Sequence, residues 1–178
     1  YSDGRVREEV SEKMKAVVEI NKLSKSFGKE QVLREISHSF ERGRIHGIIG
    51  FNGSGKTVMF KCICGFLKPD SGYVKVHGQQ IGKEIDFPKS LGMRERLGIA
   101  QAIMENPELL ILDEPFNGLD KRGVAEVCRL FEELREQGKT ILLAAHNMPE
   151  FEGLCDTVCE MDTGVLTQVK MMSFLADR

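Results

Sequence analysis

The chain has 178 residues, of which 41% are hydrophobic and 29% charged, with 25 basic and 27 acidic side chains. This composition is typical of a globular protein with one hydrophobic core and excludes an intrinsically disordered chain. The formal net charge of −2 provides no basic excess for binding a phosphate backbone, so we expect no nucleic-acid partner. No apolar run approaches the ~20 residues that span a bilayer, so we do not expect the chain to cross a membrane.

We predict one domain over residues 16–178, preceded by a polar segment over residues 1–15 that lacks the apolar core of a signal peptide. The five cysteines are odd in number and lie inside apolar patterns, which favours reduced, mostly buried thiols in a cytosolic protein. Cys155 and Cys159 could share a helix face, but no second pair or histidine stands at ligand spacing. We therefore do not expect a zinc site.

The domain begins with an antiparallel pattern. Apolar runs at residues 17–20 and 32–40 flank a turn at residues 28–29, which indicates strands joined by a tight turn. A β-branched run at residues 44–49 indicates a further strand, and apolar residues recur at helical spacing after Gly55. A strand, a glycine-rich loop and a helix are therefore expected to follow one another.

From residue 73 onward, short strands alternate with helices. The pattern predicts strands at residues 73–76, 109–112, 140–144, 157–161 and 165–169, and helices at residues 90–104, at residues 119–137 and near Pro149. Such alternation predicts an α/β fold, in which helices flank both faces of a parallel sheet and an antiparallel β subdomain precedes it. Ligands of such sheets bind at the carboxyl ends of the strands, so functional residues are expected there.

Residues 50–57 match the complete phosphate-loop pattern, a glycine and four residues followed by Gly-Lys and Ser or Thr. The glycines let backbone N–H groups converge on phosphates, and the helix that follows offers its positive end. The lysine of such a loop reaches the β- and γ-phosphates, and the threonine hydroxyl can ligate magnesium. We therefore expect an ATP-binding loop made of Gly50, Phe51, Asn52, Gly53, Ser54, Gly55, Lys56, Thr57 and Val58.

A buried strand that ends in two carboxylates follows later in the chain. The apolar run at residues 109–112 leads into Asp113 and Glu114, which is the second motif of a phosphate-loop enzyme. We expect Asp113 to hold magnesium and Glu114 to polarise the attacking water as a general base. A strand ending in Asp-Glu-Pro is also compatible with an ordinary turn, and its pairing with the phosphate loop favours the nucleotide-binding role. The expected cofactors are ATP and Mg²⁺.

Further short motifs occur in the order found in one known family. Residues 90–94 read Ser-Leu-Gly-Met-Arg, residues 117–120 read Asn-Gly-Leu-Asp, and a histidine follows the predicted strand at residues 140–144. With these motifs, residues 17–169 resemble the ATP-binding cassette (ABC) family, in the form found in bacitracin-type and related drug or peptide exporters. The resemblance implies a P-loop NTPase (RecA-like) fold. It assigns the signature to Ser90 and Gly92, the D-loop to Asp120, the switch histidine to His146 and adenine stacking to Phe27.

Single residues of these motifs also have plain structural explanations. Phe27 could pack inside the β subdomain, His146 could be a loop histidine bonded to backbone, and Ser90 could serve as a helix N-cap. The order of the motifs, rather than any one residue, supports the resemblance.

The chain departs from the family just before the signature. The family inserts a mostly helical subdomain, preceded by a Q-loop, where this chain has only the eleven residues from Gln79 to Lys89. These include Gly82, Pro88 and four charged residues, a composition that cannot form a helical subdomain. We therefore expect that subdomain to be absent and assign the Q-loop role to neither Gln79 nor Gln80.

The resemblance implies an ATP-binding subunit that hydrolyses ATP to power transport, most simply export, through a separate membrane-spanning permease. Two such subunits, identical or different, would sandwich two ATP molecules at the cytoplasmic face of the membrane. Because the helical subdomain is missing, the alternative is a remnant that binds ATP without effective hydrolysis or coupling. An ABC protein acting on ribosomes or DNA ranks last, because the chain has a single cassette and near-zero net charge.

Overall fold

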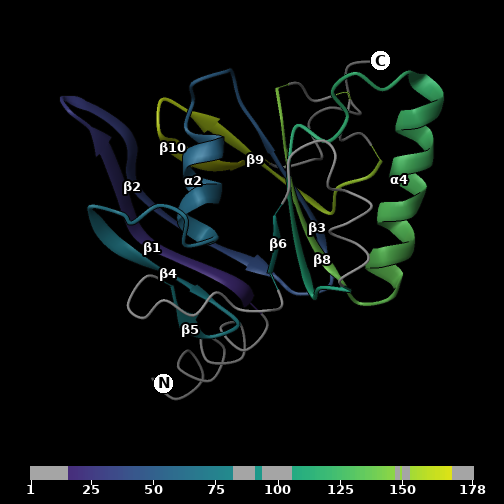
Figure 1. Cartoon of the computed structure of the whole chain (residues 1–178), viewed down its shortest axis with the longest axis horizontal. Helices are drawn as coiled ribbons and strands as arrows, with labels where there is room; N and C mark the ends of the chain where they lie inside the picture. Colours follow the sequence, from purple (N-terminus) through teal and green to yellow (C-terminus); the bar gives the residue numbers. More distant parts are fainter. Residues whose placement is uncertain (1–15, 82–90, 94–105, 147–148, 150–152, 170–178) are drawn as a thin grey trace, which may run out of the picture.

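The computed structural model describes residues 16–81, 91–93, 106–146, 149 and 153–169, which form two sheets and two helices (Figure 1). The helices are α2 (Lys56–Ile63) and α4 (Lys121–Glu136). The strands are β1 (Ala16–Phe27), β2 (Glu30–Glu41), β3 (Ile45–Ile49), β4 (Ser71–Val76), β5 (Gln79–Gln80), β6 (Leu91–Met93), β7 (Leu109–Asp113), β8 (Thr140–Ala145), β9 (Thr157–Asp162) and β10 (Val165–Val169). Neither described helix is long and apolar enough to cross a membrane.

The smaller sheet has four antiparallel strands in the order β2-β1-β4-β5. β1 and β2 form a long hairpin in which Phe27 pairs with Glu30, so the turn expected at residues 28–29 is confirmed. β4 pairs along the other side of β1, with Val18 opposite Val76. The antiparallel beginning predicted from the sequence is therefore present, and the short strand β5 extends it by pairing with β4.

The larger sheet has six strands in the order β10-β9-β3-β8-β7-β6. All neighbouring pairs are parallel except β9 and β10, which form an antiparallel hairpin. β3, β7 and β8 are almost entirely buried, as is typical of parallel strands covered on both faces. The predicted α/β fold is confirmed, and the order places the carboxyl ends of β3, β8 and β7 side by side.

Two hydrophobic clusters cover the two faces of the larger sheet. Leu109 and Ile111 of β7 belong to the cluster that includes α2, whereas Leu110 and Leu112 belong to the cluster that includes Phe131 of α4. This alternation follows from the two-residue period of a strand. α2 lies between the two sheets and α4 covers the opposite face (Figure 1). Both helices thereby fix loops at the carboxyl edge of the sheet.

The helix expected over residues 90–104 is wrong at Leu91–Met93, which form the edge strand β6. In a parallel ladder, Leu91 pairs with Leu109 and Met93 with Ile111. The exposed edge of β7 offers unpaired N–H and C=O groups, and the glycine at position 92 weakens a helix, so pairing prevails here. Residues 90 and 94–104 lie outside the described residues, as does most of the helix expected near Pro149.

The five cysteines are free thiols, as predicted. Cys62, Cys64, Cys155 and Cys159 are buried, and Cys128 is half-buried. Burial raises the pKa of the Cys62 and Cys159 thiols to about 11 and that of Cys64 to about 12, so they stay protonated at neutral pH. Among the described residues, no group of three or more His, Cys, Asp or Glu side chains has the arrangement of a metal site.

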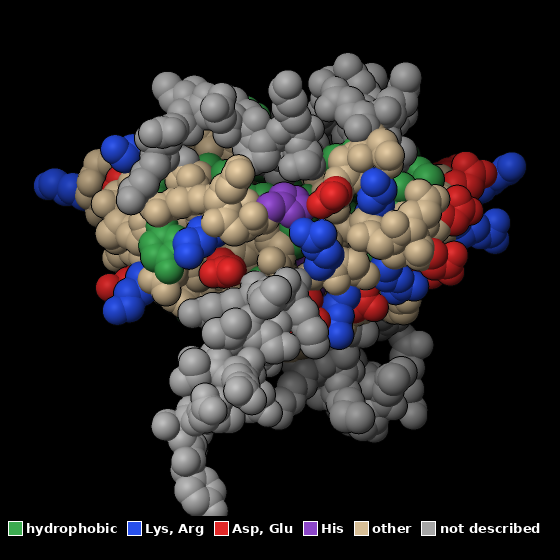
Figure 2. All heavy atoms as spheres, turned by 90° about the horizontal axis from the view of Figure 1, so that it is seen from below, with side chains coloured by type: hydrophobic (Ala, Val, Ile, Leu, Met, Phe, Trp, Pro, Cys, Tyr) green, Lys and Arg blue, Asp and Glu red, His purple; other side chains and the backbone are tan. Residues whose placement is uncertain are grey.

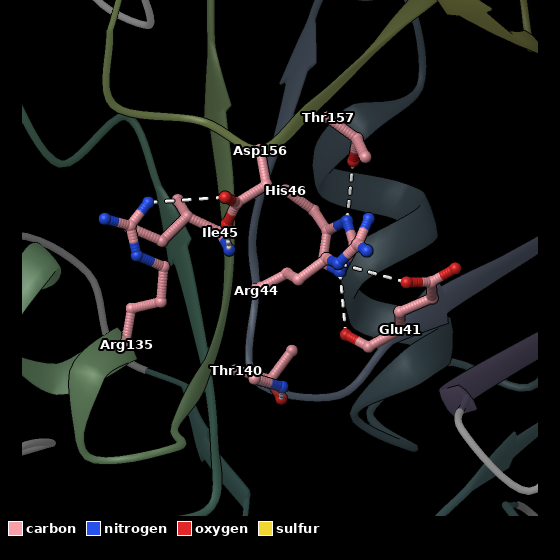
Figure 3. A network of polar contacts seen from close by, with 9 residues as sticks. Glu41, Arg44, Ile45, His46, Arg135, Thr140, Asp156 and Thr157 are labelled. Carbon is pink, nitrogen blue, oxygen red and sulfur yellow. Dashed lines mark hydrogen bonds and ion pairs between the residues drawn. The ribbon is translucent and has the colours of Figure 1, made fainter.

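Polar contacts tie together the amino ends of β3 and β9 (Figure 3). The N–H of Ile45 donates to Asp156 Oδ2 at 2.8 Å. His46 lies 2.6 Å from the Thr157 hydroxyl through Nδ1 and 2.8 Å from the Glu41 carbonyl through Nε2. These contacts fix the register of the two strands, and with it the positions of the residues at their carboxyl ends.

Figure 2 shows the amino edge of the sheet from below, where basic and acidic side chains lie interspersed around a histidine. At this edge Arg42 Nη2 lies 3.1 Å from His77 Nδ1. The carboxylate of Glu108 lies 3.7 Å from both Arg42 and His77. This edge therefore carries charges of both signs.

Candidate functional site

The phosphate loop connects β3 to α2 at the carboxyl edge of the larger sheet. Gly55 has a φ of +113°, which side-chain-bearing residues rarely adopt. Gly50 is required by a close approach, because a Cβ there would overlap the carbonyl oxygen of Met161 and lie 2.7 Å from Ser54 Oγ. The loop thus curls around the first turn of α2, whose N–H groups have no partners within the helix and bind anions.

Lys56 is folded into the loop that it belongs to. Its ammonium group donates to the carbonyl oxygen of Gly50 at 2.5 Å and to that of Phe51 at 3.2 Å. Only 5% of the residue is exposed, so its charge is held at the centre of the loop. A lysine ammonium has three donors, and phosphate oxygens can take the place of these carbonyls.

Thr57 and Asp113 meet across the site from two different elements. The Thr57 hydroxyl, in the first turn of α2, donates to Asp113 Oδ2 at 2.5 Å. Asp113 Oδ1 is buried and has no hydrogen-bond partner within the described part of the chain. Such an oxygen is costly to leave unpaired, and a divalent cation bound by carboxylate and hydroxyl oxygens would satisfy it. These residues therefore fit a Mg²⁺ ion.

Glu114 and His146 lie side by side because β8 is the neighbour of β7. Glu114 Oε2 is 3.0 Å from His146 Nδ1, and the Glu114 N–H donates to the Ala144 carbonyl at 2.9 Å. Glu114 has a φ of +52°, a conformation that is uncommon for a residue with a side chain and that occurs at functional sites. Its side chain is 21% exposed and that of His146 is 47% exposed, so solvent reaches both.

A cavity of about 330 Å³ brings most of the predicted residues together. Residues 52–58 of the phosphate loop line it together with Asp113 and Glu114 at the end of β7 and Phe27 at the end of β1. Phe27 is 50% exposed and therefore does not fill the core of the β subdomain. The cavity thus joins the phosphate loop and its lysine to an aromatic side chain, a lining that suits a nucleotide.

Three other predicted residues, Asp120, Phe51 and Gly92, are not among the residues that line this cavity. Asp120 is the N-cap of α4, and its Oδ1 accepts from the Gly123 N–H at 2.8 Å. Phe51 is 81% exposed in the loop. Gly92 belongs to β6, whereas Ser90 lies outside the described residues. The roles expected for these four residues stay predictions, as do those of the residues that line the cavity.

Sequence reasoning missed three residues that shape the site. Glu30 and Val32, at the start of β2, line the cavity. Gly164, in the turn between β9 and β10, donates its N–H to the Ser54 carbonyl at 3.0 Å. Glu30 and Val32 could have been found from their place across the predicted turn from Phe27. Gly164 could not, because the sheet order that brings it to the loop is not visible in the sequence.

Comparison with known proteins agrees with this geometry. The family described as "ABC transporter" matches the chain in two pieces, residues 33–90 and 86–117. The uncharacterized ABC transporter ATP-binding protein YybJ of Bacillus subtilis is 30% identical over 217 aligned positions, which cover 90% of this chain and 100% of that protein. The alignment is longer than the chain, so the relative contains residues that have no counterpart here.

A second relative belongs to the same family, and two solved structures share the fold. The bacitracin transport ATP-binding protein BcrA of Enterococcus faecalis is 30% identical, over 93% of this chain and 72% of that protein. The fold matches cbiO1 of Clostridium perfringens, with a TM-score of 0.76 over 85% of this chain and 87% of that chain at 22% identity. It matches the ATP-binding cassette MJ1267 with a TM-score of 0.78, over 85% and 89% of the two chains at 19% identity. The chain therefore belongs to the family of ABC transporter ATP-binding proteins.

Proposed function

We propose that the chain binds ATP with Mg²⁺ and hydrolyses it to power transport through a separate membrane-spanning permease. The observation that supports this most directly is the contact of Thr57 with Asp113, next to Lys56 and Glu114. It joins the two motifs of a phosphate-loop enzyme in one cavity, although they are far apart in the sequence. A pocket that only bound phosphate would need no carboxylate beside the phosphate loop.

Each side chain has a distinct part in the proposed hydrolysis. Lys56 and the first N–H groups of α2 bind the β- and γ-phosphates and stabilise the charge that develops on them. Glu114 accepts a proton from the attacking water, whose oxygen bonds to the γ-phosphorus as the bond to the ADP oxygen breaks. His146, which lies 3.0 Å from Glu114, orients that carboxylate and contacts the γ-phosphate.

Thr57 and Asp113 would hold the magnesium ion through the hydroxyl and the unpaired Oδ1. When bound, Mg²⁺ neutralises phosphate charge and fixes the geometry of the phosphates. Phe27 would stack on the adenine ring at the other end of the cavity.

We further propose that the chain lies at the cytoplasmic face of a membrane, bound to its permease, and that it pairs with a second ATPase subunit. The relative named for bacitracin transport favours export as the direction.

Steady-state ATP hydrolysis by the purified chain with Mg²⁺ tests the proposal. Glu114→Gln should lower the rate by roughly 10²- to 10⁴-fold while ATP still binds, because the amide cannot take the proton. Lys56→Ala should lose both binding and hydrolysis, because it removes the charge at the centre of the loop. Tight ATP binding without Glu114-dependent hydrolysis would contradict the proposal and indicate the alternative, a module that only binds the nucleotide.

A further inference from the structure

The ammonium group of Lys25 lies over one face of the Phe27 ring, which lines the cavity. Lys25 and Phe27 are two residues apart on β1, so they lie on the same face of the strand. The Lys25 ammonium is 5.6 Å from the centroid of the Phe27 ring, within the ~6 Å over which a cation is attracted to a ring face. A ring has two faces, and the ammonium covers one, which leaves the other for a base.

Asp70 holds this lysine in place. Its Oδ1 lies 2.7 Å from Lys25 Nζ, and its Oδ2 accepts the N–H of Ser26 at 2.7 Å. The Asp70 N–H in turn donates to the carbonyl of Ser24 at 2.9 Å. The hydrogen bonds from Lys25 and from the Ser26 N–H lower the pKa of Asp70, which keeps the carboxylate ionised. One acidic residue thus binds both the side chain and the backbone of the strand that carries Phe27.

The same residue connects the ring to the phosphate loop. Asp70 follows α2, whose first turn lines the cavity. The chain therefore runs from Lys56 through α2 to Asp70 and from there, through the ion pair, to Lys25. These contacts connect the strand that carries Phe27 to the segment that follows the phosphate loop and α2, although Phe27 is half exposed and lies at the end of a hairpin.

We propose that Lys25, held by Asp70, is a positioning residue for adenine recognition, which orients the Phe27 ring and leaves one face for the base. This inference rests on the proposed function, because it assumes that the cavity binds ATP. Lys25 acts through the ring and touches neither the phosphates nor the base.

The test compares ATP with inorganic tripolyphosphate, which has the phosphates but no base, in titrations with Mg²⁺. Lys25→Met should weaken ATP binding by about two- to five-fold, the size of an exposed cation–π contact, and should leave tripolyphosphate binding unchanged. Asp70→Asn should act in the same direction, because the amide still accepts from Ser26 but no longer pairs with a charge. Lys29→Met, which removes an equal charge from the turn of the same hairpin, is the matched control and should not discriminate between the ligands.

A double-mutant cycle completes the test. In a Phe27→Leu background, Lys25→Met should have no further effect on ATP binding, because the ring through which it acts is gone. Equal weakening of both ligands by Lys25→Met, or an effect that persists without the ring, would overturn the inference. If the unmodified chain binds neither ligand, the proposed function itself fails, and if it binds both equally well, only the adenine-positioning role fails.

Discussion

Gly55 satisfies two constraints at a single position of the phosphate loop. Its φ of +113° lies where side chains are rarely tolerated, and a Cβ there would be 3.0 Å from both the Val32 carbonyl oxygen and Leu33 Cδ2. The first constraint comes from the turn into α2 and the second from the packing of the loop on β2. Loop conformation and cavity wall are therefore coupled at this residue.

We predict that Gly55→Ala lowers the free energy of unfolding by about 2 kcal/mol or more, because backbone strain adds to the contact with Val32. ATP binding should weaken as well, since the loop N–H groups no longer converge. Gly78→Ala is the matched control: its φ is +79°, but a Cβ there meets nothing within 4 Å, so it should cost only about 1 kcal/mol. Urea unfolding and ATP titration measure both effects, and equal losses in the two variants would contradict this account.

Two of the strands show what an element's sequence can and cannot predict. The apolar run of β7 predicts a buried strand ending in Asp113, and the structure confirms it, because burial on both faces requires an unbroken apolar run. The helix expected from residue 90 is wrong at Leu91–Met93, which form β6 because the edge of β7 offers backbone N–H and C=O groups for pairing. Local pattern thus determines the strand that the core surrounds, whereas an edge element depends on a neighbour that is distant in the sequence.

His46 shows the same limit for polar contacts. Its partner Thr157 is 111 residues away, so nothing near His46 in the sequence indicates the contact. A carbonyl oxygen can only accept, so Nε2 carries the proton toward Glu41 and Nδ1 accepts from the Thr157 hydroxyl. A neutral imidazole fits this arrangement, which joins the amino ends of β3 and β9.

Stability should therefore fall at acid pH through His46. Burial lowers the pKa of His46 below its ordinary 6.5, outweighing the hydrogen bond to Glu41 and the charge of Asp156. The unfolded chain then binds a proton more readily than the folded one, so stability is fully present above pH 6.5 and is lost as the pH falls below it.

Replacing His46 tests this pH dependence. His46→Gln should lower the free energy of unfolding at neutral pH. That free energy should also fall less between pH 7 and pH 5 than in the unmodified chain, as measured by urea unfolding at each pH. The free energy of unfolding of the variant should still fall somewhat as the pH falls, because burial also lowers the pKa of His38 and His77. Identical slopes in the variant and the unmodified chain would show that another group is responsible.

For the whole molecule, the lining of the cavity is assembled although only eleven residues, 79–89, stand where the family has a helical subdomain. The family matches in two pieces that meet at residues 86–90, and the described chain passes from the four-stranded sheet to the edge of the six-stranded sheet with no described helix between α2 and β7. The cavity is lined by the phosphate loop, the first turn of α2, the end of β1, the start of β2 and the end of β7. The sequence predicted this core correctly because each motif is local, and the missing segment removes none of those motifs.

The missing helical subdomain raises the question of whether two chains can pair around ATP. We predict that the Glu114→Gln chain, which binds ATP but hydrolyses it slowly, doubles its mass with ATP and Mg²⁺ in light scattering, because two bound nucleotides can each bridge two subunits. Lys56→Ala should stay monomeric under the same conditions, since its loop no longer holds the phosphates. A Glu114→Gln chain that binds ATP and yet remains monomeric would exclude a homodimer. Hydrolysis would then require a different cassette as the second subunit, and mixing the chain with such a partner should restore the Glu114-dependent rate.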